Sequence, residues 1–177
     1  MATATDVAKI LPEDAAGPCE PGDAKGPCVL GDSGETGDAA GPCEPGWMDA
    51  HLEGLGCLLF GTEPGTFQDA NTFCFNKSAH LVEVLTEDQM DYMVMELQLL
   101  ETLLGERWYW GGGTDWNREG QWYWAHSLIP IETFVWGKEE PNRGISENYM
   151  VFFPKHGYYG ADIENEYGSP YPICQKY

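Results

Sequence analysis

All seven tryptophans of this 177-residue chain lie at or after position 47, so the large side chains that build a core are concentrated in the later part of the sequence. The first 42 residues are rich in Gly and Pro and cannot bury enough apolar surface to offset the entropy lost on ordering. They also repeat, since "DAAGPCEPG" stands at 14–22 and again at 38–46. We therefore expect an acidic, disordered repeat tail at 1–42 and one folded domain at 43–177.

The net charge excludes two classes of partner. Twenty-nine acidic residues against nine basic ones give a formal charge of -20, which repels nucleic acid phosphates and anionic lipid surfaces. No apolar run approaches the roughly 20 residues that a membrane-spanning helix needs. We expect no nucleic acid partner and no membrane insertion.

The cysteines indicate the redox compartment. There are six, and they form no CxxC pair or His spacing that suits zinc, which favours disulfides and an extracellular location. The first residues lack the basic leader and apolar stretch of a secretory signal, so a cytosolic protein with six free thiols stays as the alternative. In the tail, Cys19 and Cys28 could pair with each other or link two chains into an oligomer, and a merely flexible duplicated tail is the plainer interpretation.

Local patterns predict an α+β domain. Thr66 with Asp69 can cap a short helix that runs to residue 75, and "TEDQ" at 86–89 forms a capping box for a longer helix ending near Gly105. The second half favours short strands and loops. Strands are expected at 79–84, 108–115, 119–126 and 149–153. We expect four tryptophans to lie in the core rather than to stack on sugar rings: Trp110, Trp122, Trp124 and Trp136.

The order of short motifs resembles the C-type lectin family from Cys43 to Cys174, and in particular long-form, EPN-bearing members of the invertebrate type. The matching motifs are "CEPGW" at 43–47, "GLGCLLF" at 54–60, "FCFNKSAHLVEV" at 73–84, "WYWGGGTD" at 108–115, "EGQWYW" at 119–124, "EEPN" at 139–142, "ENY" at 147–149 and "YPIC" at 171–174. The resemblance implies a C-type lectin-like fold with two helices, antiparallel sheets and a long irregular ligand-binding loop.

The resemblance also implies two disulfides. Cys74 would join the first helix to the last strand through Cys174, and Cys43 would close an N-terminal hairpin with Cys57. Another bridge of the family is missing, because Tyr149 and Asn165 occupy its two cysteine positions.

A calcium site follows from the same resemblance. The ligands would be Glu140 and Asn142, on either side of a cis Pro141, together with Glu147 and Asp162. Their carboxylate and amide oxygens are the donors that this hard cation prefers. Gly160 and Ala161 stand where the family has Trp and Asn, so four of the five usual side-chain ligands remain.

The Glu-Pro-Asn order implies a calcium-dependent lectin that selects equatorial 3- and 4-hydroxyls, as in mannose, glucose, N-acetylglucosamine or fucose. The same four residues would hydrogen-bond the sugar. The alternative is a calcium-independent C-type lectin-like domain that binds a protein or another non-sugar ligand. We expect no enzyme, because the four histidines show no paired metal spacing and no Ser or Cys stands in a nucleophile motif.

Overall fold

A computed structural model describes residues 43–142, 144–164 and 170–177. The expected tail at 1–42, with Cys19 and Cys28, lies outside the described residues, and so does Asn165. The elements in chain order are β1 (Met48–Ala50), β2 (Gly56–Phe60), α2 (Phe67–Phe75), β3 (His80–Leu81), α3 (Glu87–Leu104), β4 (Tyr109–Thr114), β5 (Tyr123–Trp124), η1 (Thr133–Val135), η2 (Gly144–Ser146), β6 (Tyr149–Phe152), η3 (Pro154–His156), β7 (Gly160–Ile163) and β8 (Tyr171–Lys176).

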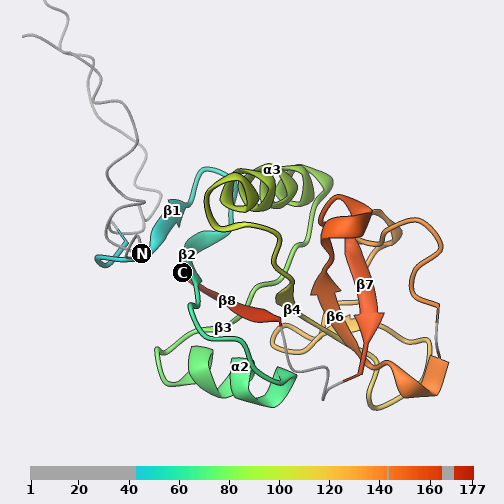
Figure 1. Ribbon diagram of the computed structural model, residues 1–177. Helices are drawn as coiled ribbons and strands as arrows, with labels where there is room; N and C mark the ends of the chain where they lie inside the picture. The colour runs from blue at the N-terminus through green and yellow to red at the C-terminus, as the bar shows by residue number, and fades with distance from the viewer. Residues whose placement is uncertain (1–42, 143, 165–169) are drawn as a thin grey trace, which may run out of the picture. The chain divides into compact units, whose positions relative to one another are not determined.

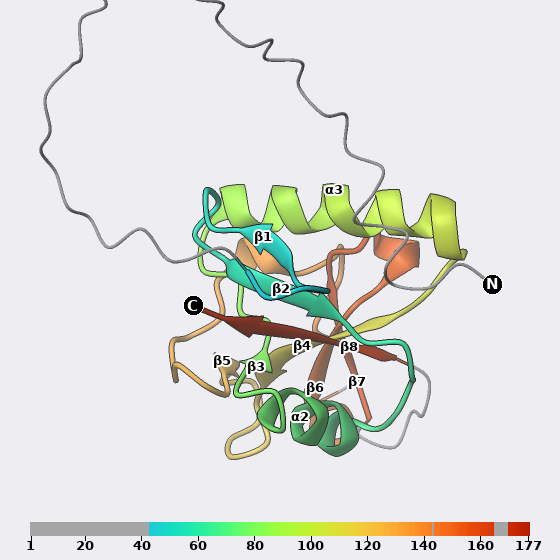
Figure 2. The same ribbon diagram turned by 90° about the vertical axis from the view of Figure 1, so that its left-hand side faces the viewer.

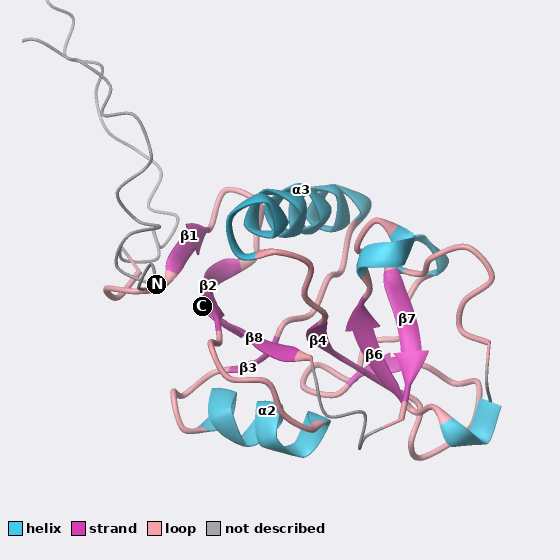
Figure 3. Ribbon diagram, viewed as in Figure 1, coloured by secondary structure: helices cyan, strands magenta, loops and turns pink. Residues whose placement is uncertain are grey.

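The two helices lie on opposite sides of a central group of strands (Figure 1; Figure 2). The strand order is β1-β2-β8-β4-β6-β7, with β3 also paired to β8 and β5 to β4. All pairs are antiparallel except β4 with β8. Figure 3 shows the strands between the helices and the loop-rich region around β6 and β7. The expected α+β fold is confirmed.

Both helices begin at the expected caps. The Thr66 hydroxyl accepts from the Asp69 amide at 3.1 Å, and an Asp69 carboxylate oxygen accepts from the Thr66 amide at 3.1 Å. In α3 the Thr86 hydroxyl accepts from the Gln89 amide, and Gly105 ends the helix with φ of 79°. The Gln89 side chain differs from a capping box, since its carbonyl oxygen accepts from the Leu85 amide and its amide donates to the Gly54 carbonyl.

Two expected strands are shorter than predicted. In the segment 79–84 the strand covers His80–Leu81, and Val82 still makes backbone hydrogen bonds to Ile173 and Gly112. At Glu83 the amide donates instead to the Gln175 side chain. The buried Glu83 carboxylate accepts from the amides of His126 and Ser127 at 2.8 and 3.0 Å. The segment 119–126 pairs only at Tyr123–Trp124. At Glu83 a side chain thus takes the place of the neighbouring strand as backbone partner.

The cysteines form the two bridges that the resemblance implies. Cys74 in α2 is bonded to Cys174 in β8, and the bridge closes a separation of 100 residues. Cys43 is bonded to Cys57 in β2, with a separation of 14 residues. The long bridge therefore ties the first described helix to the last strand. Both of its cysteines belong to a buried apolar cluster that also contains Trp110 and Val151.

The tryptophans divide between core and surface. Trp110 and Trp124 are fully buried, as predicted. Trp122 and Trp136 are only half-buried and pack against the core. The prediction that all four lie in the core is therefore wrong in part, and the two half-buried rings remain accessible beside the loop that leads to β6.

Candidate functional site

The loop before β6 is fastened to strand β7 at Asn142. Its backbone amide donates to the Asp162 carboxylate oxygen Oδ1 at 2.9 Å, and its side-chain amide donates to Glu140 Oε2 at 2.8 Å. The bond between Glu140 and Pro141 is cis. Asp162 lies in β7 opposite Met150 of β6 and is 4% exposed. Three of the four predicted ligands thus form one hydrogen-bonded group.

Glu140 is the most strongly perturbed carboxyl of this group. Its side chain is 8% exposed, and its Oε1 lies 3.0 Å from His156 Nε2. The pKa of Glu140 is raised to about 8, first by burial and then by the hydrogen bond to Asp162 and the negative charges of Asp162 and Glu147. Proximity of like charges in a low-dielectric site makes each ionisation unfavourable unless a cation compensates.

Glu147, the fourth predicted ligand, acts on Glu140 through its charge. It follows the short helix η2, and its amide donates to the Gly144 carbonyl at 3.0 Å. Its side chain is half-buried, and its charge acts on Glu140. The described residues of the loop and strand β7 therefore form a group of acidic and amide side chains around Glu140, joined by the hydrogen bonds of Asn142 and by the charges of Glu147 and Asp162. The assignment of its members as calcium ligands stays a prediction.

Two more acidic residues belong to the same electrostatic group, and the sequence interpretation missed them. Asp115 is 1% exposed; its Oδ2 accepts from the Gly120 amide at 2.8 Å, and its Oδ1 has no hydrogen-bond partner among the described residues. Burial and the charge of Asp162 raise the pKa of Asp115, and burial with the charges of Asp115 and Asp162 raises that of Glu119. Asp115 is the last residue of the motif "WYWGGGTD", and Glu119 is the first residue of "EGQWYW". Their positions in these two motifs were the only sequence signal that could have drawn attention to them.

The departures at 160 and 161 have a structural explanation. Ala161 is 3% exposed and packs in the apolar cluster with Trp110 and Val151, so it contributes no oxygen. At Gly160 a Cβ would lie 2.9 Å from the Met150 terminal methyl and 3.1 Å from the Val135 carbonyl oxygen. A bulky residue at 160 would therefore require its neighbours to move.

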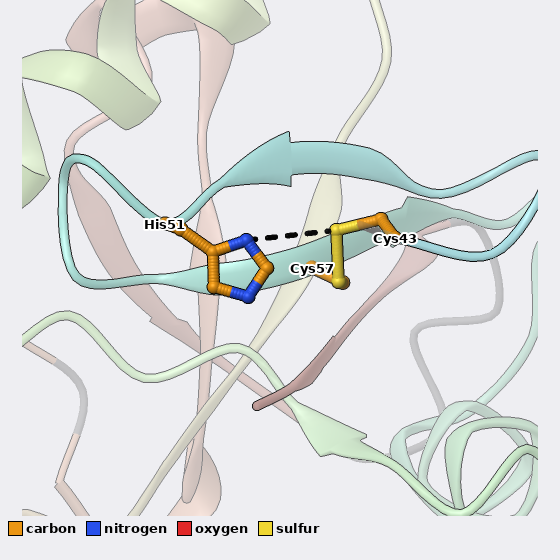
Figure 4. Close-up of side chains that lie close together, drawn as sticks. All are labelled: Cys43, His51 and Cys57. Carbon is orange, nitrogen blue, oxygen red and sulfur yellow. Dashed lines mark hydrogen bonds between the residues drawn. A yellow bond between two sulfur atoms is a disulfide. The ribbon is translucent and has the colours of Figure 1, made fainter. Parts of the chain in front are cut away.

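A group of side chains of the types that bind metal ions lies at the N-terminal hairpin (Figure 4). Cys43, His51 and Cys57 present ligand atoms within 4.8 Å of one another. His51 Nδ1 lies 2.7 Å from Asp49 Oδ1 and 3.8 Å from the Cys43 sulfur. Because the two sulfurs are bonded to each other, neither is the thiolate that a zinc site requires. The cluster is therefore a bridged hairpin with an adjacent imidazole.

The comparisons with known proteins agree with this architecture. No protein-family model matches the chain. CD209 antigen-like protein A of Mus musculus is 26% identical over 132 residues, which cover 73% of this chain and 51% of the relative. The CD209 antigen of Macaca mulatta is 27% identical over 104 residues, or 58% of this chain and 24% of the relative. The chain thus spans about half or less of the length of these relatives.

Three solved structures illustrate the likeness in fold. A mouse scavenger receptor C-type lectin carbohydrate-recognition domain gives a TM-score of 0.63 with 24% identity over 76% of this chain and 98% of that chain. SPL-1 in complex with GlcNAc gives a TM-score of 0.64 with 22% identity, over 76% of this chain and 94% of that chain. A calcium-independent type II antifreeze protein gives 0.62 with 23% identity, also over 76% and 94%.

The relatives and structures are named as an antigen, a lectin domain or an antifreeze protein, or by a complex with GlcNAc. No helix in the described part of the chain is long and apolar enough to cross a membrane. The motif order, the two bridges, the strand arrangement and these likenesses identify the described part of the chain as a C-type lectin-like domain.

Proposed function

We propose that this domain binds sugars through a calcium ion held by Glu140, Asn142, Glu147 and Asp162. The observation that carries the proposal is the concentration of acidic groups around Glu140, whose pKa rises to about 8 because burial and neighbouring carboxylates oppose its ionisation. A divalent cation would remove this cost, and the available donors are the oxygens that calcium prefers.

The donor and acceptor arrangement suits a sugar hydroxyl. The Asn142 amide lies 2.8 Å from a Glu140 carboxylate oxygen, so a hydrogen-bond donor and an acceptor stand side by side. A hydroxyl that approaches this pair can accept from the amide and donate to the carboxylate. The Glu-Pro-Asn order supports a preference for mannose-type sugars, and the likeness to a structure in complex with GlcNAc supports the same class.

A calcium-independent ligand remains the second candidate, favoured by two observations. Ala161 supplies no oxygen, and the Glu140 carboxyl already lies 3.0 Å from His156 Nε2, which can stabilise it without an ion. One of the similar structures is a calcium-independent antifreeze protein. In this case the ligand would be a protein or another non-sugar molecule.

Retention on immobilised mannose tests the proposal. With about 10 mM calcium, above the 10⁻⁴ to 10⁻³ M dissociation constants of extracellular calcium modules, the protein should be retained and then released by a chelator. Glu140→Gln and Asn142→Ala should abolish retention. Glu139→Gln is the matched control, because its side chain is 82% exposed. Retention that persists in the chelator would favour the second candidate, and failure to bind any mannose-type sugar would overturn the first.

We also propose that the protein acts outside the cell, with residues 43–177 as the folded unit. Single-site sugar affinity near 1 mM corresponds to about -4 kcal/mol, so useful recognition requires several linked domains. Cys19 and Cys28 could supply that linkage. Non-reducing electrophoresis of the full chain should then show disulfide-linked oligomers, and a purely monomeric band would contradict this part of the proposal.

A further inference from the structure

The N-terminal hairpin places a histidine beside its own disulfide. His51 lies in the turn between β1 and β2, and its Nδ1 is 3.8 Å from the Cys43 sulfur. One ligand atom from each of Cys43, His51 and Cys57 lies within 4.8 Å of the other two (Figure 4). Cysteine thiolates and histidine nitrogens are the ligands that zinc prefers in proteins. When the disulfide is broken, these three side chains become a set of zinc ligands.

The spacing of the three ligand atoms suits a tetrahedral ion. With Zn–S bonds of about 2.3 Å and Zn–N bonds of about 2.0 Å, neighbouring ligand atoms of a tetrahedron lie about 3.5 to 3.8 Å apart. Once the S–S bond is broken, the two sulfurs reach this spacing by separating to ordinary non-bonded contact. The three side chains leave the fourth position of the tetrahedron to water or to the neighbouring Asp49 carboxylate.

Contacts other than the disulfide hold the ligands near one another. Asp49 pairs with Cys57 in the ladder between β1 and β2. Asp49 Oδ1 accepts from the His51 amide at 3.0 Å and lies 2.7 Å from His51 Nδ1. Next to Cys43, a Glu44 carboxylate oxygen lies 2.9 Å from the Lys176 ammonium. None of these contacts requires the S–S bond, so the ligands stay together when it breaks.

The hairpin bridge is also the more accessible of the two disulfides. Cys43 is half-buried and Cys57 is 5% exposed, whereas Cys74 and Cys174 are both 0% exposed. Thiol–disulfide exchange requires access to a sulfur atom. A dissolved reductant therefore opens the hairpin bridge first, while the buried bridge still ties α2 to β8.

We propose that the reduced hairpin binds one Zn²⁺ through Cys43, His51 and Cys57, with Asp49 as the residue that positions the imidazole ring. A dithiol supplies the two electrons: the S–S bond breaks, each sulfur becomes a thiol, and the dithiol becomes its own disulfide. Zinc then displaces both thiol protons and binds the two thiolates. The ion replaces the bridge, so the hairpin is closed in an oxidising and in a reducing compartment.

The site is separate from the proposed calcium site. The strands β1 and β7 stand at opposite ends of the strand order, and calcium takes oxygen donors whereas this site offers sulfur and nitrogen. Failure of sugar binding would therefore leave this inference standing, and the reverse also holds.

Cobalt(II), a spectroscopic substitute for zinc, tests the inference on the full chain. A water-soluble phosphine is the reductant, because it reduces the S–S bond by becoming its oxide and adds no thiol that binds metal. Thiol labelling and peptide mass analysis should show Cys43 and Cys57 reduced, with Cys74 still bonded to Cys174. One equivalent of Co²⁺ should then give thiolate-to-metal charge-transfer absorption, and one equivalent of Zn²⁺ should remove it. The unreduced protein is the first control and should show no such absorption.

Variants locate the ion. Loss of a carboxylate that holds a ligand costs about 10-fold to 100-fold in metal affinity, so Asp49→Asn should weaken zinc binding by about 10-fold and His51→Ala by about 100-fold or more. His126→Ala, at an exposed histidine outside the hairpin, is the matched control and should bind as the wild type does. The pair Cys19→Ser with Cys28→Ser should also keep full affinity, which separates the hairpin from the other cysteines.

Four results would overturn the inference. They are absence of the absorption in the reduced protein, its full retention in His51→Ala, its loss in the variant that lacks Cys19 and Cys28, and reduction of the buried bridge ahead of the hairpin bridge. Circular dichroism follows the fold throughout. Unfolding after reduction of the hairpin bridge alone would also contradict the inference, because the ligands would no longer be held together.

Discussion

Glu140 Oε1 and His156 Nε2 lie 3.0 Å apart, and this contact joins the proposed binding loop to the short helix between β6 and β7. The other oxygen of Glu140 accepts from the Asn142 amide. Both ends of one buried carboxyl are therefore positioned before any ligand arrives. A preorganised donor loses less conformational entropy when an ion binds, which strengthens binding.

The stability of the ion-free domain should fall as pH rises between about 4.5 and 8. The folded state raises the pKa of Glu140 from 4.5 to about 8, so in this window the folded protein holds a proton that the unfolded chain has released. Stability then decreases with pH, because the native state binds more protons. Urea unfolding at several pH values with a chelator present measures the effect. Glu140→Gln should flatten the dependence, and identical pH profiles for the two proteins would contradict the assignment.

Calcium should protect the domain more at pH 8 than at pH 6. A proton and the calcium ion compete for the Glu140 carboxylate, so calcium binds more weakly at lower pH. At a calcium concentration 100 times the dissociation constant, the expected stabilisation is about 2.7 kcal/mol. Thermal unfolding with and without calcium at the two pH values checks this. Magnesium at the same concentration is the control for ionic strength, and an equal shift with both ions would indicate nonspecific screening.

Replacement of Asp115 by Asn should stabilise the ion-free domain. Asn retains an oxygen to accept from the Gly120 amide, and it removes a buried charge that faces Asp162. If Asp115 contributes to ion binding, the same variant should reduce the stabilisation by calcium. Parallel unfolding curves in chelator and in calcium separate these two effects, and a loss of stability in chelator would show that the charge has an unrecognised partner.

Restoration of the family's asparagine at position 161 should destabilise the domain. The Ala161 methyl lies among apolar side chains, so an amide there would be buried without a partner, at a cost of about 1 to 3 kcal/mol. Ala161→Asn should therefore unfold at a lower urea concentration. Ala161→Val is the control, because it adds side-chain volume at the same position without a polar group. A variant Ala161→Asn with unchanged stability and stronger calcium binding would show that β7 can shift to present the new ligand.

The two bridges should differ in their contribution to stability. In the loop-entropy description, closing 100 residues stabilises by about 4 to 5 kcal/mol and closing about 15 residues by about 3 kcal/mol. The paired variant Cys74→Ser with Cys174→Ser should therefore unfold more easily than Cys43→Ser with Cys57→Ser. Denaturant midpoints compare the two pairs, and equal losses would favour enthalpic contributions that do not depend on separation.

Local features of the domain were predictable from the sequence, and features made by distant contacts were not. The cap at Thr66 depends on a residue three positions away, so both partners are visible in one window. The strand expected at 79–84 ends early because the Glu83 amide bonds the side chain of the distant Gln175, which no local pattern reveals.

The same distinction holds at the site. Glu140, Asn142, Glu147 and Asp162 were predicted from motif order. The structure brings the charges of Glu147 and Asp162 to bear on Glu140, and Asn142 hydrogen-bonds to both Glu140 and Asp162. Asp115 and Glu119 lie more than 20 residues earlier, and only folding connects them to Asp162. The half-exposure of Trp122 and Trp136 was also missed, because an alternating pattern assigns a face to a side chain without showing how deeply that face is covered.

The pairing of β1 with β2 and of β2 with β8 brings the two ends of the described domain together, where the Lys176 ammonium lies 2.9 Å from a Glu44 carboxylate oxygen. The strands β6 and β7 lie at the opposite end of the sheet order. Both ends of the described domain therefore lie at one edge of the sheet, and the strands next to the proposed binding loop lie at the other edge.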